Sequence, residues 1–175
     1  MNRPIALRAA ADALANVGVT EEGENRGKWV ETYLRAVGLP PGSPWCAAFV
    51  RFRFEQAAAA LKLPLPTGFP DSGWTPDYKD WARSAGLWVP VESAEAEPFQ
   101  IRPGDLVCFY FSAKSRIAHI EIAVEPGQAW GVNTVGGNTG PEAGAEVQRD
   151  GDGVYRKRRE WDELGRYGGF VRMNC

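Results

Sequence analysis

The sequence is poor in histidine and cysteine, and this shortage excludes several kinds of site. It contains one histidine and three cysteines among 175 residues. The cysteines are widely spaced and odd in number, which argues against a disulfide framework and against a zinc site. We therefore expect no metal and no other cofactor. At least one thiol should be free, which fits synthesis in a reducing compartment.

Excess positive charge and long apolar segments are also missing. The formal net charge is -2, and no basic stripe is interleaved with exposed aromatic residues, so nucleic acid is not an expected partner. No apolar run approaches the roughly 18 residues that a membrane span requires. The stretch from Ile5 to Val19 is interrupted by Arg8 and Asp12 and has no clear cleavage site, so we expect cytoplasmic synthesis without a signal peptide. An extracytoplasmic target would then be reached by non-classical export or after lysis.

The composition and length of the chain are typical of one globular domain. Apolar residues make up 44% of the chain and charged residues 24%, and the length is sufficient for a sizeable core. Helical periodicity dominates the first half and strand-like runs the second. This order predicts an α+β fold with N-terminal helices packed on a small antiparallel β-sheet. We expect a single domain over 1–175, with an N-terminal helical part over 1–42 and the chemistry in 43–175.

Periodicity and turn residues predict the individual elements. Helices are expected over residues 4–17, 27–37, 44–62 and 75–85. Strands are expected over residues 106–111, 117–125, 129–135, 153–159 and 170–173. The acidic segment 92–97 should be a connector, and the glycine-rich segment 136–140 a turn.

The longest predicted helix begins at Pro44–Trp45–Cys46. Ser43 is a plausible N-cap, and Pro44 suits the first helical position. Cys46 then falls in the first turn, where unpaired N–H groups and the helix dipole stabilise a thiolate and lower the thiol pKa. Such a thiolate attacks an amide carbonyl once a base and an oxyanion site are supplied, the latter including the Cys46 N–H. A small buried cysteine beneath a helix start is the alternative interpretation.

His119 is the only histidine, so it is the only imidazole that can serve Cys46 as a base. It lies in a predicted strand, where alternation places Ile117, His119, Glu121 and Ala123 on one face. We expect the imidazole to project toward the layer that carries the Cys46 helix. A lone histidine without a catalytic role is the alternative interpretation.

Four short blocks of the sequence occur in a distinctive order. They are Pro44–Trp45–Cys46–Ala47–Ala48–Phe49–Val50, then Pro103–Gly104–Asp105–Leu106–Val107, then His119 in its strand, and then Gly137–Asn138–Thr139. Together they resemble the CHAP family of cysteine amidases and peptidases, within the papain-like group that also holds the NlpC-type hydrolases. The resemblance implies a helix-borne cysteine packed on a small antiparallel sheet that carries the histidine. It also implies hydrolysis of an amide bond in bacterial peptidoglycan.

Carried over position by position, the resemblance makes Cys46 the nucleophile and His119 the general base. Asn138 matches the family's asparagine, whose side-chain carbonyl can hold the second ring nitrogen. Family members often have Glu two residues before that asparagine, where this chain has Gly136, and a small residue two after the histidine, where it has Glu121. We therefore predict that Glu121 supplies the carboxylate that position 136 lacks. A solvated or substrate-facing Glu121 is the alternative.

Substrate contacts are predicted for Trp45, Trp74 and Gly137, with core packing as the alternative for the two tryptophans. Cys108 lies in an apolar strand and is expected to be an inert core thiol. The basic run 156–159 is expected on a solvated edge strand.

The leading hypothesis from the sequence is a peptidoglycan hydrolase, either an N-acetylmuramoyl-L-alanine amidase or a stem-peptide or cross-bridge endopeptidase. Both a phage-type endolysin and an antibacterial toxin delivered to a rival's periplasm fit, and a toxin would require an immunity protein in its producer. Two alternatives stay open. One is a catalytically degenerate wall-binding module, and the other is a papain-like enzyme that acts on proteins.

Overall fold

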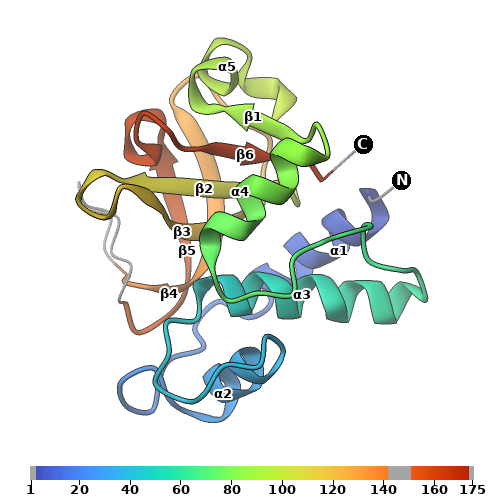
Figure 1. The fold of residues 1–175 in the computed structure, drawn as a ribbon, viewed down its shortest axis with the longest axis vertical. Helices are drawn as coiled ribbons and strands as arrows, with labels where there is room; N and C mark the ends of the chain where they lie inside the picture. Colours follow the sequence, from blue (N-terminus) through green and yellow to red (C-terminus); the bar gives the residue numbers. More distant parts are fainter. Residues whose placement is uncertain (1–2, 142–150, 174–175) are drawn as a thin grey trace.

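The computed structural model describes residues 3–141 and 151–173, and within them it confirms the predicted α+β fold (Figure 1). The α-helices are α1 (Arg3–Leu14), α2 (Lys28–Arg35), α3 (Cys46–Leu61), α4 (Thr75–Ser84) and α5 (Val91–Ala96). The strands are β1 (Trp88–Pro90), β2 (Leu106–Phe111), β3 (Arg116–Ala123), β4 (Gly131–Thr139), β5 (Gly153–Glu160) and β6 (Gly169–Val171). They form one antiparallel sheet in the order β1-β6-β2-β3-β4-β5.

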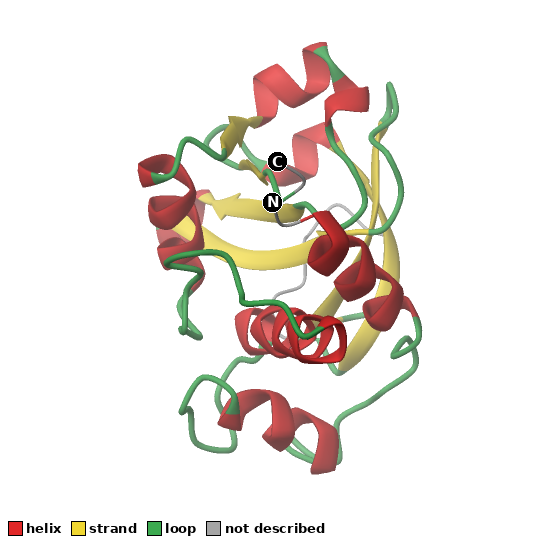
Figure 2. Cartoon of the chain, turned by 90° about the vertical axis from the view of Figure 1, so that its right-hand side faces the viewer, coloured by secondary structure: helices red, strands yellow, loops and turns green. Residues whose placement is uncertain are grey.

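The long helix α3 links the helical layer to the sheet. It contacts β3 and β4 on one side, and both α1 and α2 pack against it. Figures 1 and 2 show α2 on the far side of α3 from the sheet. None of the helices in the described residues is long and apolar enough to cross a membrane.

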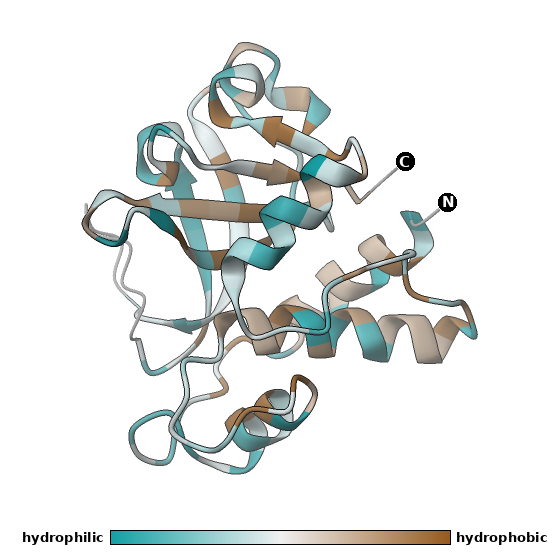
Figure 3. Cartoon of the chain, viewed as in Figure 1, coloured by the Kyte–Doolittle hydropathy of each residue, from teal (hydrophilic) through white to brown (hydrophobic). Residues whose placement is uncertain are grey.

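Apolar clusters cover both faces of the sheet. Strand β2, which contributes to both, is coloured as largely hydrophobic in Figure 3. Ile120 and Ile122 of β3 belong to the cluster that includes α1 and α3. Phe109 and Ala123 belong to a second cluster with residues of α5 and of the 3-10 helix Trp161–Leu164. Successive side chains of a strand point to opposite faces, so β3 contributes to both clusters.

The alternation along β3 is interrupted, which corrects the predicted position of Ile117. Phe109 pairs with His119, but the next residue, Tyr110, pairs with Ile117, so the register skips Ala118. Such a bulge shifts the side chains before it to the other face. Ile117 consequently packs with Ile120 in the α1–α3 cluster. His119 and Glu121 lie on the opposite face, where His119 packs on Phe109 of the second cluster, and not on the face that packs against the body of α3 as predicted. The imidazole nevertheless interacts with Cys46, the first residue of α3.

The other elements lie within a few residues of their predicted bounds, with three differences. The helix predicted from Pro44 begins at Cys46, with Trp45 as its N-cap and no side-chain cap from Ser43. The acidic segment 92–97, expected to be a connector, lies mostly in α5. Strand β1 was not predicted, because three residues are too few to show a period.

The predicted turn at 136–140 is wrong, because β4 continues through Thr139. Its glycines serve close packing instead of a turn. A Cβ on Gly137 would lie 2.4 Å from Cζ3 of Trp45 and 2.9 Å from Cβ of Phe49. Glycine at this position therefore lets β4 approach the first turn of α3.

We expect Gly137→Ala to lower the free energy of unfolding by about 1–3 kcal/mol, because the added methyl group overpacks the core at Trp45. Urea unfolding measures this change. The same substitution in a Trp45→Phe background should cost less, since the phenyl ring lacks the atom that the methyl group would meet. An equal cost in both backgrounds would contradict the packing explanation.

Candidate active site

Cys46 is the first residue of α3, and a distant strand fixes the start of this helix. The Trp45 N–H donates a 3.0 Å hydrogen bond to Oδ1 of Asn138, which lies 93 positions further along the chain in β4. The first N–H groups of a helix have no acceptor within the helix. Cys46 therefore lies among backbone donors at the positive end of the α3 dipole, as the sequence predicts.

The imidazole of His119 is fully buried and is held on several sides. Its Nε2 lies 3.0 Å from Oε1 of Glu121, and its ring packs against that of Phe109 with centroids 5.6 Å apart. Nδ1 has no hydrogen bond of standard geometry to any described residue. Because Glu121 occupies Nε2, Nδ1 is the nitrogen left to the Cys46 thiol, which interacts with this ring.

The protonation of His119 reflects both neighbours. Burial by itself would lower its pKa, but the interactions with Cys46 and Glu121 and the negative charges of both groups outweigh it and raise the pKa to about 9. The imidazolium is thus the favoured form at neutral pH. Because the attraction between two charges is mutual, the same contact stabilises a Cys46 thiolate.

Glu121 is a fully buried carboxylate with donors around both oxygens. Besides His119, it accepts a 2.5 Å hydrogen bond from Oγ1 of Thr134, a 3.0 Å bond from Nε of Arg159 and a further bond from Nη2 of Arg159. Burial would raise the pKa of Glu121, but the charge of Arg159 and these hydrogen bonds hold it well below its usual range. Glu121 therefore stays ionised and can orient the imidazole.

The packing at Gly136 bears on the prediction that Glu121 supplies the carboxylate that position 136 lacks. A Cβ at Gly136 would lie 2.6 Å from Cγ and 2.8 Å from Oε1 of Glu121. The Glu121 side chain thus fills the space that a side chain at position 136 would enter. A side chain at position 136 and the Glu121 side chain would therefore compete for the same space.

Arg159 is a site residue that the sequence patterns do not predict. The basic run 156–159 predicts a solvated edge strand, and β5 is indeed at the edge of the described sheet. However, Lys157 and Arg159 are buried, whereas residues 156 and 158 are exposed. Arg159 also contacts Oε1 of Glu163 through Nη1 at 3.3 Å, and the two carboxylates raise its pKa despite the opposing effect of burial. Because successive side chains of a strand point to opposite faces, half of a basic run in a strand must face inward, and this is the one signal that the sequence holds for Arg159.

Asn138 does not make the predicted contact with the imidazole. Its Oδ1 accepts the Trp45 N–H, and its Nδ2 donates to Oδ1 of Asn25 and to the carbonyl of Gly151, both at 3.0 Å. Its φ of 58° lies in the left-handed region, at a register shift between Gly136 and Thr139. The side chain is thereby committed to the start of α3, and Glu121 takes the ring nitrogen expected for Asn138.

Of the three predicted substrate contacts, two are in the core. Trp45 is fully buried, donates from Nε1 to Oε1 of Glu21 at 2.7 Å and packs on Tyr33. Gly137 is covered by Trp45, so neither residue is placed to meet a substrate. Core packing, the alternative interpretation for Trp45, is what the structure shows.

Trp74 lies at the surface. It is 50% exposed, and the guanidinium carbon of Arg116 is 4.0 Å from the centre of its ring. Together with Ser43 and Pro44 it lines a pocket of about 400 Å³. This pocket therefore reaches the segment that leads directly into Cys46.

The other thiol in the described residues has a different environment. Cys108 lies in the apolar cluster of β2, where burial raises its pKa strongly, as expected for an inert core thiol. Over residues 3–141 and 151–173, no group of three or more His, Cys, Asp or Glu side chains could hold a metal ion.

The raised pKa of His119 predicts a pH-dependent stability. A group with pKa 6.5 in the unfolded chain and about 9 in the fold contributes stability that is complete below pH 6.5 and is lost as the pH rises to 9. We expect the urea-derived free energy of unfolding to fall over this interval. His119→Gln should flatten the fall, and an unchanged slope in that variant would contradict this assignment.

Comparison of the chain with protein-family models, with curated proteins and with solved structures gives no match. The resemblance to the CHAP family thus stays an expectation from the sequence, and the site must be judged by its own geometry.

Proposed function

We propose that this chain hydrolyses an amide bond of bacterial peptidoglycan, with Cys46 as the nucleophile. One observation carries the proposal: the only imidazole interacts with a thiol at a helix start and is held at Nε2 by a buried carboxylate. Nucleophile, base and orienting group in this relation suit acyl transfer. The choice of peptidoglycan comes from the sequence blocks that resemble the CHAP family.

In the proposed reaction the Cys46 thiolate attacks the amide carbon, a C–S bond forms and the carbonyl electrons move to oxygen. Backbone N–H groups at the start of α3 stabilise the oxyanion. The His119 imidazolium gives its Nδ1 proton to the departing amine as the C–N bond breaks. Neutral His119 then removes a proton from water, which attacks the thioester, and Cys46 leaves as a thiolate. Glu121 stabilises each imidazolium stage through Nε2.

The pocket at Trp74 supports a route for the substrate. Cys46 is only 3% exposed and His119 is fully buried, so a carbonyl can meet the thiol only after local movement near the start of α3. Ser43, Pro44 and Trp74 line that pocket. An exposed indole suits the apolar faces of sugars and peptides. We propose that the substrate lies in this pocket and reaches Cys46 along the segment 43–45.

The test is incubation of the protein with purified sacculi, followed by mass analysis of the released fragments. An amidase releases whole stem peptides, whereas an endopeptidase releases shortened peptides or separates cross-linked ones. Cys46→Ala should abolish release, and Cys108→Ala, the same change in a core thiol, should retain it. Binding to sacculi without release would favour the wall-binding module. If the protein neither binds sacculi nor releases fragments, the result would favour a protein substrate.

A further inference from the structure

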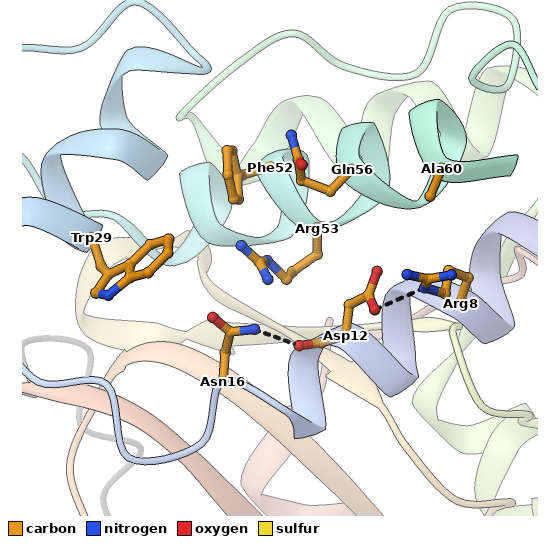
Figure 4. Close-up of a pocket in the computed structure, with 8 residues that line it drawn as sticks. All are labelled: Arg8, Asp12, Asn16, Trp29, Phe52, Arg53, Gln56 and Ala60. Atoms are coloured by element: carbon orange, nitrogen blue, oxygen red, sulfur yellow. Dashed lines mark hydrogen bonds and ion pairs between the residues drawn. The ribbon is translucent and has the colours of Figure 1, made fainter. Parts of the chain in front are cut away.

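A second cavity, of about 310 Å³, lies between α1, α2 and α3 (Figure 4). Helix α1 supplies Arg8 and Asp12 to its wall, α2 supplies Trp29, and α3 supplies Arg53 and Gln56. Arg53 follows Cys46 by seven residues, which is roughly 10 Å along the helix axis. This cavity is therefore separate from the proposed reaction site, and the inference below does not depend on that reaction.

The guanidinium of Arg53 is the unusual feature of this cavity. Arg53 is only 5% exposed, and its Nε is fully buried without a hydrogen-bond partner among the described residues. Its contacts are with aromatic rings, at 4.5 Å from Phe52 and 5.4 Å from Tyr33. Burial lowers its pKa more than the charges of Tyr33 and Asp12 raise it, so its charged form is held at a cost. Buried charges in proteins are normally paired with an anion.

A second polar group beside Arg53 is also buried without a hydrogen-bond partner. The hydroxyl of Tyr33 is buried and has no hydrogen-bond partner among the described residues. Burial raises its pKa, so it remains a neutral O–H donor. Two neighbouring donors with unmet hydrogen-bonding capacity, one of them lining a cavity, point to an acceptor that enters from outside.

The rest of the wall indicates which acceptor fits. Nε of Arg8 lies 2.8 Å from Oδ1 of Asp12, so the one carboxylate of the wall is hydrogen-bonded to Arg8, and its charge also acts on Arg53 without a hydrogen bond to it. Its negative charge disfavours a multiply charged anion but tolerates a single carboxylate at Arg53. Asn16 donates from Nδ2 to the Asp12 carbonyl at 2.7 Å, which leaves its Oδ1 as an acceptor (Figure 4).

The remaining side chains suit a peptide. The carboxamides of Asn16 and Gln56 match the donors and acceptors of peptide groups. Trp29 is 46% exposed and offers an apolar face at the cavity wall. The volume admits a ligand near the lower end of the range for small-molecule sites. We infer that this cavity binds the C-terminal carboxylate of a short peptide, with Arg53 as the carboxylate partner and Trp29 beneath the last residue.

The probe is N-acetyl-alanyl-alanine, compared with its C-terminal amide and with inorganic phosphate, in calorimetric titrations of the whole chain. We expect the acid to bind at least tenfold more tightly than the amide, and phosphate no more tightly than the amide. Arg53→Met should weaken binding of the acid at least tenfold with little change in thermal stability, because it removes a buried charge that no anion hydrogen-bonds in the described residues, and the methionine keeps the apolar contacts with the rings. Arg35→Met, which removes an exposed arginine of α2, is the matched control and should bind as wild type.

If the Arg53→Met variant does not fold, Arg53→Lys replaces it in the test. The Arg53→Lys variant should bind the acid more weakly than wild type because lysine lacks the planar fork of donors. Equal affinity for acid and amide, unchanged binding in the Arg53 variant that folds, or no binding of the acid to wild type would each overturn the inference. Phosphate binding as tight as that of the acid would overturn it as well, because it would show a general anion site.

Discussion

Glu121→Gln should lower the turnover of the proposed hydrolysis by a factor on the order of 10² to 10⁴, the range over which orienting carboxylates act in catalytic triads. Glu121 holds Nε2 of His119 at 3.0 Å and stays ionised beside Arg159, so it fixes the tautomer and stabilises the imidazolium. An amide at this position keeps the size of the side chain but loses the charge. Turnover on sacculi or on a soluble muropeptide measures the effect.

Asn138→Ala is the matched comparison for this experiment. Asn138 contacts Trp45, Asn25 and Gly151, so its loss should lower stability more than turnover at temperatures where the variant stays folded. If Glu121→Gln instead keeps turnover within about threefold of wild type, less than 1 kcal/mol of barrier, Glu121 does not orient the base.

A double variant distinguishes a purely structural role of Glu121 from a role in orienting His119. Changing Glu121 alone leaves Arg159 buried with only Glu163 as a carboxylate partner, and this costs stability. Glu121→Leu combined with Arg159→Met removes both buried charges, so stability should recover relative to Glu121→Leu. Turnover should not recover, because His119 still lacks its orienting carboxylate. Recovery of both quantities would show that Glu121 acts on the fold alone.

Arg159→Met should lower the free energy of unfolding by about 3–5 kcal/mol, the usual cost of removing one partner of a buried ion pair. Arg159 donates from Nε and Nη2 to Glu121, and its charge is the main influence that keeps the Glu121 pKa low. Urea unfolding gives the stability change. Arg156→Met on the same strand removes an exposed arginine and should change stability by less than about 1 kcal/mol.

The same variant should also change the pH profile of the reaction. Without Arg159 the pKa of Glu121 rises, so the carboxylate is protonated at a higher pH and the acid limb of turnover moves upward. A loss of stability without this movement would make Arg159 a structural residue only. Arg159 touches no reacting atom in the proposed mechanism, and both observations together would establish it as a positioning residue.

Local patterns accounted for much of the fold. The absence of Gly and Pro after Pro44 predicts the long helix that starts at Cys46, and the apolar run at residues 106–111 predicts β2 with its observed bounds. These features follow from dihedral preferences and periodicity, which act over a few residues. The turn predicted at 136–140 is wrong because glycine serves both in turns and where two segments pack closely. Only the neighbours of Gly136 and Gly137 in the fold show that these glycines serve close packing.

Local patterns predict the parts of the site: a cysteine at a helix start, a single histidine in a strand and a glutamate two residues after it. Their contacts follow from the packed fold, because they depend on strand register and bulges that no local pattern encodes. Arg159 meets Glu121 across 38 positions of the chain, and Asn138 meets Trp45 across 93. The desolvation that sets the charges of His119 and Glu121 likewise exists only once the sheet and α3 have packed together.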